Sequence, residues 1–220
     1  MITVIPLHLI ESYRSHLAAE DHILLQDISW ETFEQLIIEL ESRPNDRLTY
    51  DNGQLEIWMP LIPHESYKRW LGRILELITE ELDIEIRSLG STTWRRRDLA
   101  KGIEADECYY IQNEAAIREK MDIDLTIDSP PDLAIEIDIT SLSLPRLPIY
   151  SALGIPEVWR FDGELVQILV LNQTTYGEVP RSIALPTITP EVLQNFLEQA
   201  KTMGETSWAK SVRQWAMLQH

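Results

Sequence analysis

Three carboxylates interrupt an apolar segment of the chain, residues 130–139. Asp132, Glu136 and Asp138 occupy even positions there, whereas every odd position from 133 to 139 holds leucine or isoleucine. Because side chains alternate between the two faces of a β-strand, the three acids should share one face. Buried charges without partners are costly, so that face requires a metal ion, a basic side chain or water. The segment therefore predicts either a metal–carboxylate site or an edge strand with a solvated acidic face.

A second group of charged side chains could contact phosphate. Four basic residues follow Trp94 closely, and we call them the basic patch: Arg95, Arg96, Arg97 and Lys101. The net charge of −17 argues against a general nucleic-acid coat protein, because neutralisation of phosphates drives such binding. It is compatible with an enzyme that reaches phosphate through metal ions and a local group of cations. The patch is either a DNA-contacting surface or a charged loop or strand end exposed to water.

Cysteine usage and short motifs exclude several other chemistries. The one cysteine, Cys108, cannot form an intrachain disulfide or supply a zinc cluster, and it suits a reducing cytosol. The sequence has no Gly-X-Ser-X-Gly motif and no recognisable phosphate-cradling glycine loop. No apolar run approaches the roughly 20 residues of a membrane helix, and the first residues do not resemble a secretory signal. We therefore expect a cytoplasmic protein without a membrane partner.

Hydrophobic periodicity locates the elements that must position these side chains. Residues 48–50 and 55–59 flank Asp51-Asn52-Gly53, which is typical of a hairpin with a type I′ turn. Apolar residues recur at helical spacing from 63 to 82, which predicts a long helix. By the same criteria we expect further helices over 30–40, 145–153, 192–200 and 208–218. Strands are expected over 84–89, 91–97, 107–111, 132–139, 156–161 and 165–171.

This order of elements predicts an α+β (mixed α/β) fold around one central sheet. A chain of 220 residues is long enough for one good-sized core. We assign residues 1–28 to a peripheral N-terminal arm, 29–200 to a single domain and 201–220 to a C-terminal helical tail. Trp208 and Trp215 give this tail apolar surface that a small core does not require, which indicates a homodimer.

Three stretches of the chain, residues 102–111, 131–140 and 150–160, resemble signature sequences of one family. Their combination and order are those of the Uma-two family of restriction-endonuclease-like proteins, and the hairpin followed by His64-Glu65 fits as well. The resemblance covers about residues 30–200. It implies a fold of the PD-(D/E)XK nuclease superfamily, a restriction-endonuclease-like mixed sheet flanked by helices, with the acids gathered at one side of the sheet.

The resemblance implies a metal-dependent endonuclease that hydrolyses DNA phosphodiester bonds. Asp106 and Glu136 would correspond to the two acids of the family motif and would hold Mg²⁺ or Mn²⁺, which favour oxygen ligands. The metal would activate water and stabilise charge on the scissile phosphate. Glu65, at the start of the long helix, would be an additional catalytic acid. His64 beside it would be either a neighbour of the site or a histidine satisfied within the fold.

Two positions depart from the family motif. The residue before Asp106 is Ala105 rather than proline, which leaves the acid in place. Asp138 stands where the motif has lysine, and the resemblance implies that Arg146 on the following helix takes that role. Arginine stays protonated and cannot shuttle a proton, so this departure concerns catalytic rate more than ligand geometry. Asp132 and Asp138 would be additional ligands or would bind neighbouring backbone and basic groups.

Three functions remain open at this point. The first is a metal-dependent endonuclease acting on DNA. The second is a catalytically inactive nuclease-like binding or assembly module, which the acidic net charge and the missing lysine favour. The third is a glycosidase-like enzyme that uses paired carboxylates as acid and base. Binding of magnesium or manganese separates the first function from the other two.

Overall fold

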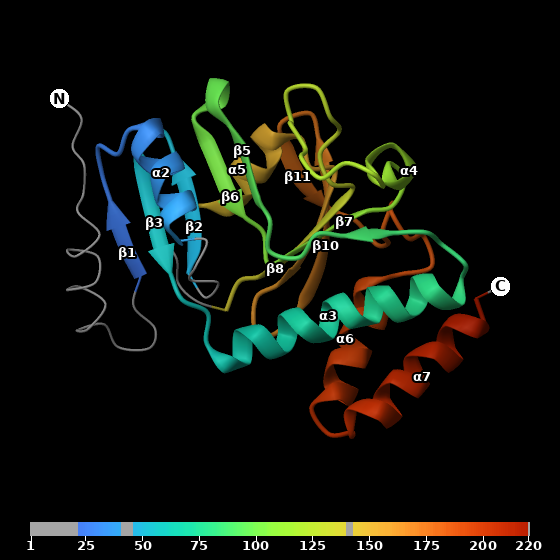
Figure 1. The fold of residues 1–220 in the computed structure, drawn as a ribbon. Coiled ribbons are helices and arrows are strands. Elements are labelled where there is room, and N and C mark those ends of the chain that lie inside the picture. Colours follow the sequence, from blue (N-terminus) through green and yellow to red (C-terminus); the bar gives the residue numbers. More distant parts are fainter. Residues whose placement is uncertain (1–21, 41–45, 140–142, 220) are drawn as a thin grey trace.

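Two β-sheets and the helices packed against them form the molecule (Figure 1). The computed structural model describes residues 22–40, 46–139 and 143–219. The chain passes directly from the first sheet into the second between Glu104, the last residue of β6, and Glu107, the first residue of β7. Asp106 therefore lies at the junction of the two sheets. The predicted α+β fold with a central mixed sheet flanked by helices is confirmed.

The first sheet is antiparallel and has the strand order β1-β3-β2-β6-β5. Asn52 and Gly53 connect its predicted hairpin with φ angles of 48° and 87°, as a type I′ turn requires. Helix α2 (Trp30–Leu40) packs on this sheet, and Phe33 stacks on Tyr50 of β2. The strands are β1 (His22–Leu25), β2 (Arg47–Asp51), β3 (Gln54–Trp58), β5 (Thr93–Arg96) and β6 (Lys101–Glu104).

The second sheet is mixed and has the strand order β11-β10-β9-β8-β7-β4. Strands β8 and β9 are parallel, with helix α5 (Arg146–Leu153) between them in the chain, and the other neighbouring pairs are antiparallel. Its strands are β4 (Arg87–Ser88), β7 (Glu107–Tyr110), β8 (Leu133–Ile137), β9 (Glu157–Phe161), β10 (Val166–Asn172) and β11 (Thr175–Glu178). Two short helices, η1 (Arg97–Leu99) and α4 (Glu114–Ile117), complete the middle of the chain.

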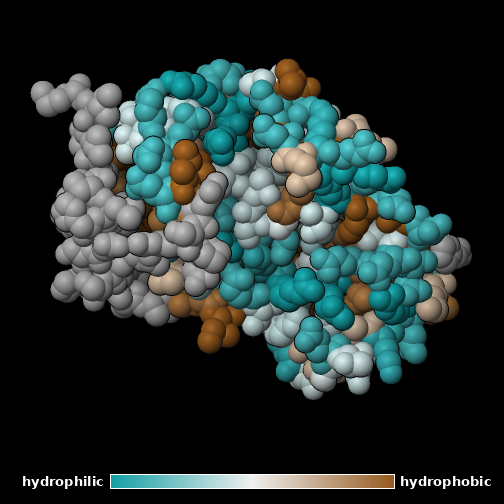
Figure 2. Space-filling model, viewed as in Figure 1, coloured by the Kyte–Doolittle hydropathy of each residue, from teal (hydrophilic) through white to brown (hydrophobic). Residues whose placement is uncertain are grey.

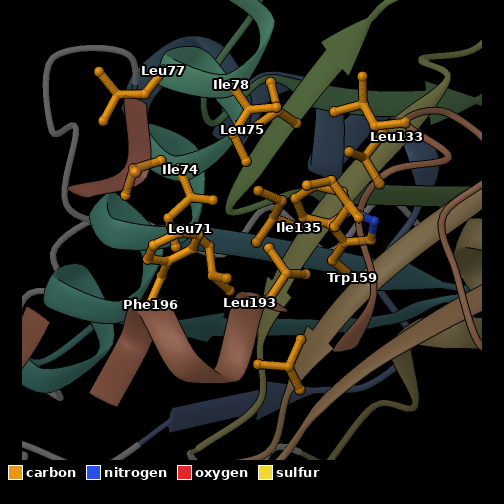
Figure 3. Close-up of a cluster of buried hydrophobic side chains, with 14 of the residues drawn as sticks. Leu71, Ile74, Leu75, Leu77, Ile78, Leu133, Ile135, Trp159, Leu193 and Phe196 are labelled. Carbon is orange, nitrogen blue, oxygen red and sulfur yellow. The ribbon is translucent and has the colours of Figure 1, made fainter. Parts of the chain in front are cut away.

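The main hydrophobic core lies between the second sheet and three helices, α3 (Ile62–Glu81), α6 (Pro190–Ala200) and α7 (Glu205–Met217). Figure 3 shows Ile135 and Trp159 of the sheet in one cluster with side chains of α3 and α6. Leu133 and Ile137 belong to the same cluster, whereas Ala134 belongs to a second cluster with Tyr150 of α5. The predicted division of odd and even positions along β8 is therefore confirmed.

Three parts of the chain differ from the sequence-based expectation. The strands form two sheets rather than one, and residues 101–104, for which no strand was expected, form β6 between β2 and β5 of the first sheet. Residues 22–25, expected in a peripheral arm, form β1 at the edge of the first sheet, and residues 1–21 lie outside the described residues. Helix α7 packs into the main core rather than forming an appended tail, since Trp208 is fully buried there and Trp215 packs against the same cluster.

Hydrophobic side chains are scattered rather than gathered on the face of the molecule that Figure 2 shows. Figure 2 shows a mainly hydrophilic face on which hydrophobic side chains form separate small patches. The two tryptophans that suggested a homodimer pack within the molecule, so the apolar surface behind that argument is already covered. Within the described ranges, no helix combines the length and the apolar character that crossing a bilayer requires.

Candidate active site

Asp106 is completely buried at the junction of the two sheets. Its Oδ2 atom accepts a hydrogen bond from the backbone N–H of Ile137 (2.8 Å) and lies 3.2 Å from Nε2 of His64. Strands β7 and β8 pair with Glu107 opposite Ile135, and continuing this register places Asp106 beside Glu136. Within the described structure, Oδ1 of Asp106 is buried without a hydrogen-bond partner. One carboxylate oxygen is thus held by the fold, and the other has no hydrogen-bond partner among the described residues.

Glu136 extends from β8 to the α5 side of the sheet and is also buried. The Tyr150 hydroxyl donates a hydrogen bond to its Oε2 (2.6 Å), and Nε of Arg146 lies 2.7 Å from its Oε1. Burial raises the pKa of Glu136 to about 7, although the nearby Arg146 guanidinium acts in the opposite direction. Arg146 and Tyr150 are four residues apart on α5, a spacing that places both side chains on one face of the helix.

Arg146 connects this carboxylate with the first sheet. Its Nη2 donates a hydrogen bond to the backbone oxygen of Glu104 (2.7 Å), the last residue of β6. The guanidinium also lies over the ring of Trp58, with 5.6 Å between its central carbon and the ring centroid. The side chain is therefore held on three sides, by Glu136, by Glu104 and by Trp58.

The start of α3 adds a histidine and an acid to the group of charged side chains around Asp106 and Glu136, which we call the cluster. His64 is fully buried, with its ring edge-on to Trp58. Burial disfavours the charged imidazole, but the neighbouring carboxylates of Asp106 and Glu65 outweigh it and raise the pKa of His64 to about 9. The side chain of Glu65 is 46% exposed and lies 3.6 Å from Nδ1 of His64. Histidine thus points into the molecule and glutamate towards its surface.

A buried pair of opposite charges completes the cluster on the side of the first sheet. Nη1 of Arg47 donates a hydrogen bond to Oε1 of Glu104 (2.9 Å), and its Nη2 lies 3.7 Å from Oε1 of Glu65. Burial raises the pKa of Glu104 to about 7, against the opposing effects of Arg47 and Arg146. Three buried carboxylates and the half-exposed Glu65 are therefore interleaved with two arginines and one histidine, and this alternation offsets the cost of burying the charged groups.

Residues of the cluster line two cavities. One, with a volume of about 320 Å³, is lined by Glu136, Asp138, Arg146 and Arg160 among others. The other, of about 600 Å³, is lined in part by Arg47 and Glu65. Glu136, although buried, thus borders a cavity on the side of α5, and the half-exposed Glu65 borders one at the start of α3.

The donor atoms suit Mg²⁺ in kind, although no preformed cluster of ligands is present. Among the residues that the structure describes, no three His, Cys, Asp or Glu side chains are grouped as a metal site. Mg²⁺ nevertheless often uses one or two carboxylates and retains several waters. Asp106 offers an unpartnered Oδ1, and Glu136 offers Oε1 opposite a guanidinium. Two carboxylate oxygens of this type fit the ion, provided that Arg146 withdraws from Glu136 or shares it.

Two of the acids predicted for this region have other partners. Asp132 accepts hydrogen bonds from the backbone N–H groups of Ile111 (2.7 Å) and Asn113 (2.9 Å), so it holds the turn after β7. It lies at the opposite end of β8 from the cluster. Asp138 accepts a hydrogen bond from Nε of Arg160 (2.9 Å) and lines the smaller cavity beside Glu136. Asp138 therefore borders the cluster, and Asp132 is separate from it.

The basic patch lies on β5, η1 and β6 of the first sheet, and acids accompany most of it. Arg96 pairs with Asp98 through Nε and Oδ1 (2.7 Å). Arg97 pairs with Glu31, and Lys101 pairs with Asp51. These pairs reduce the local positive charge that the sequence suggested, because each of these cations has an acidic neighbour.

Several residues of the cluster were not assigned a role from sequence. They are Arg47, Trp58, Glu104 and Tyr150. For Tyr150 a signal existed, since it follows Arg146 at helical spacing on a face turned to β8. For Arg47 and Glu104 the sequence carried no comparable signal, because their pairing depends on how β2 and β6 meet in the sheet.

Comparison with known proteins agrees with this architecture. Residues 30–199 match the model of the Uma2 family, whose description reads "Putative restriction endonuclease". No curated protein matches the chain. The matched range begins at α2, ends within α6 and contains every residue of the cluster. Since the match covers well over half of the sequence, the chain belongs to the Uma2 family.

Proposed function

We propose that this protein is a metal-dependent endonuclease that hydrolyses DNA phosphodiester bonds, with Asp106 and Glu136 as ligands of Mg²⁺ or Mn²⁺. The observation that carries the proposal is the pair of buried carboxylates formed by Glu136 on β8 and Asp106 directly before β7, one of which has an unpartnered oxygen. Burial of an unsatisfied carboxylate oxygen is costly, and a bound cation would offset that cost. Membership of the family supports the same chemistry.

The neighbouring residues would have distinct tasks. The N–H of Ile137 and the imidazole of His64 orient Asp106, and the Tyr150 hydroxyl orients Glu136. The metal would then bind Oδ1 of Asp106 and Oε1 of Glu136, and at the latter it would compete with Arg146. A divalent metal bound there would lower the pKa of a water molecule and offset negative charge on the phosphate. Arg146 remains protonated, so it can hold a phosphate oxygen but cannot accept a proton. Glu65, at the surface, is the acid best placed to meet solvent on the α3 side.

One observation favours a second candidate, a catalytically inactive nuclease-like module for binding or assembly. The guanidinium of Arg146 already contacts the Glu136 oxygen that a metal would use. If that ion pair is permanent, it neutralises the site without any metal. The two candidates therefore differ in whether a divalent ion competes with Arg146 for Glu136.

Nicking of supercoiled plasmid in Mg²⁺ or Mn²⁺, combined with calorimetric titration of the metal, separates the candidates. We expect the parent protein to bind metal and nick DNA, and both Asp106→Ala and Glu136→Ala to lose both properties. Glu157→Gln is a matched control, because Glu157 is equally buried but holds the backbone of Ile183 and Ala184 outside the cluster. If the parent neither nicks DNA nor binds either metal, the nuclease proposal fails and the module remains.

A further inference from the structure

Glu56 of β3 is fully buried and holds a segment far away in the sequence. Its Oε1 accepts a hydrogen bond from the backbone N–H of Ser143 (2.6 Å), and its Oε2 accepts one from Leu144 N–H (3.2 Å). His22 of β1 supports the same contact, since its Nε2 lies 2.8 Å from Oγ of Ser143 and 3.6 Å from Glu56 Oε1. A buried carboxylate with two backbone donors is a strong local constraint, because each bond is charge-assisted.

The constrained segment leads directly into the arginine of the candidate site. Leu144 is followed by Pro145 at the N-cap of α5 and then by Arg146, its first residue. Trp58, under the Arg146 guanidinium, is two residues beyond Glu56, so both side chains point to the same face of β3. One strand of the first sheet therefore fixes both the backbone before Arg146 and the guanidinium itself.

We infer that Glu56 is a positioning residue for the proposed phosphodiester hydrolysis, and that it sets Arg146 against Glu136. The catalytic consequence rests on the proposed function, whereas the positioning of Arg146 does not. The first sheet thereby has a role in the site, because Glu56 and Trp58 of β3 act on Arg146 together with the Glu104 carbonyl of β6. A purely structural role for Glu56 would stabilise the fold without any specific effect on Arg146.

Glu157 provides the comparison that separates these two roles. It is also fully buried on a strand, β9, and its Oε2 accepts hydrogen bonds from the N–H groups of Ile183 (2.8 Å) and Ala184 (2.9 Å). Replacing either glutamate by glutamine substitutes an amide NH₂ for one acceptor oxygen, and NH₂ cannot accept a hydrogen bond from a backbone N–H. Both substitutions therefore remove one buried acceptor oxygen. Glutamine at position 56 leaves one of two backbone N–H groups without an acceptor, whereas glutamine at position 157 can keep both backbone bonds and lose the bond that Nε1 of Trp159 donates to Oε1 (2.6 Å). Only Glu56 is connected to Arg146.

The first experiment observes the Arg146 Nε–H resonance by ¹H–¹⁵N NMR in the metal-free protein, assigned by its loss in Arg146→Gln. We expect Glu56→Gln to shift or broaden this resonance and Glu157→Gln to leave it unchanged. Glu56→Asp keeps the carboxylate and serves if Glu56→Gln does not fold; we expect it to shift the resonance less. An unchanged resonance in both Glu56 variants would overturn the inference, as would an equal change in Glu157→Gln.

The second experiment measures plasmid nicking at saturating Mg²⁺ in a double-mutant cycle. We expect Glu56→Gln to lower the rate by up to about 100-fold, the order expected when a catalytic group is displaced by about 1 Å. In the Arg146→Gln background the same substitution should have no further effect, because its target is absent. An equal effect in both backgrounds would contradict the inference. A parent protein without nicking activity would instead contradict the proposed function, and the NMR result would still decide the role of Glu56.

Discussion

Substituting Gly102 by alanine tests how the first sheet is built around the strand that leads to Asp106. Gly102 lies in β6 between Tyr50 of β2 and Arg95 of β5. A Cβ atom at this position would lie 2.6 Å from Cζ and 2.7 Å from Cε1 of Phe33 in α2. Carbon atoms pack at about 3.5–4.0 Å, so either the ring or the strand would have to shift.

The ring of Phe33 has little freedom to shift. It is fully buried and stacks on Tyr50 with 4.7 Å between ring centroids, and Trp30 meets it edge-on at 5.3 Å. Inserting a methyl group into such a site costs about 1–3 kcal/mol. Alanine also restricts the unfolded chain, which stabilises the folded state by about 0.4–1 kcal/mol where the conformation allows it. The packing cost is the larger effect, so we expect Gly102→Ala to lower the free energy of unfolding by about 1–2 kcal/mol.

Urea unfolding followed by tryptophan fluorescence and circular dichroism measures this difference. Gly177→Ala is the matched control, because Gly177 also lies in a strand and a Cβ added there would have no atom within 4 Å. We expect the control to be as stable as the parent or slightly more stable. Phe33→Leu, which removes the ring atoms nearest to Gly102, should recover part of the loss when it is combined with Gly102→Ala. The expected coupling is about 0.5–3 kcal/mol.

Two results would refute this reasoning. One is a Gly102→Ala protein as stable as the Gly177→Ala control, which would mean that α2 does not rest on the backbone of β6. The other is strict additivity of Gly102→Ala and Phe33→Leu, which would mean that the cost arises elsewhere than in the contact between the two residues.

Four further outcomes are expected. Arg146→Lys should raise the nicking rate at least about tenfold. A buried lysine can lose its proton, and a positioned acid–base group typically contributes about 10²–10⁴-fold to the rate. An unchanged or lower rate would contradict this expectation. Replacing the four residues of the basic patch by glutamine should reduce the slope of the logarithm of the DNA-binding constant against the logarithm of the salt concentration. The reduction should be smaller than the value of about 3.6 expected for four free cations, because acids accompany three of the four. An unchanged slope would show that the patch does not contact phosphate. Light scattering at high micromolar concentration should show a homodimer, as two cleavage sites for a duplex would require, and a monomer would exclude it. In the metal-free protein, burial opposes protonation of His64, but Asp106 and Glu65 outweigh it and raise its pKa from 6.5 to about 9. The contribution of His64 to stability should therefore be fully present below pH 6.5 and lost as the pH rises through 9. Urea unfolding below pH 6.5 and above pH 9 measures this loss of stability, which should be smaller in Asp106→Asn.

The sequence by itself determined most of the local structure and the chemical type of the site. Alternation of acidic and apolar residues placed Glu136 and Ile135 on opposite faces of β8, because a strand has a period of two whatever it packs against. Asn-Gly determined the hairpin turn, because few other residues adopt positive φ at low cost. The three motif stretches pointed to the family to which the chain belongs.

Only the tertiary structure decided which charges meet. Arg146 contacts the Glu104 carbonyl 42 residues before it, and Glu56 binds Ser143 87 residues after it. Such contacts depend on the register and mutual placement of two sheets, which no local periodicity encodes. The tertiary structure also changed the pKa values of these acids, because burial raises the pKa of Glu104 and Glu136 above that of a carboxyl group in water. The acids could be identified from the sequence, whereas their partners depend on contacts between segments that are distant in the sequence.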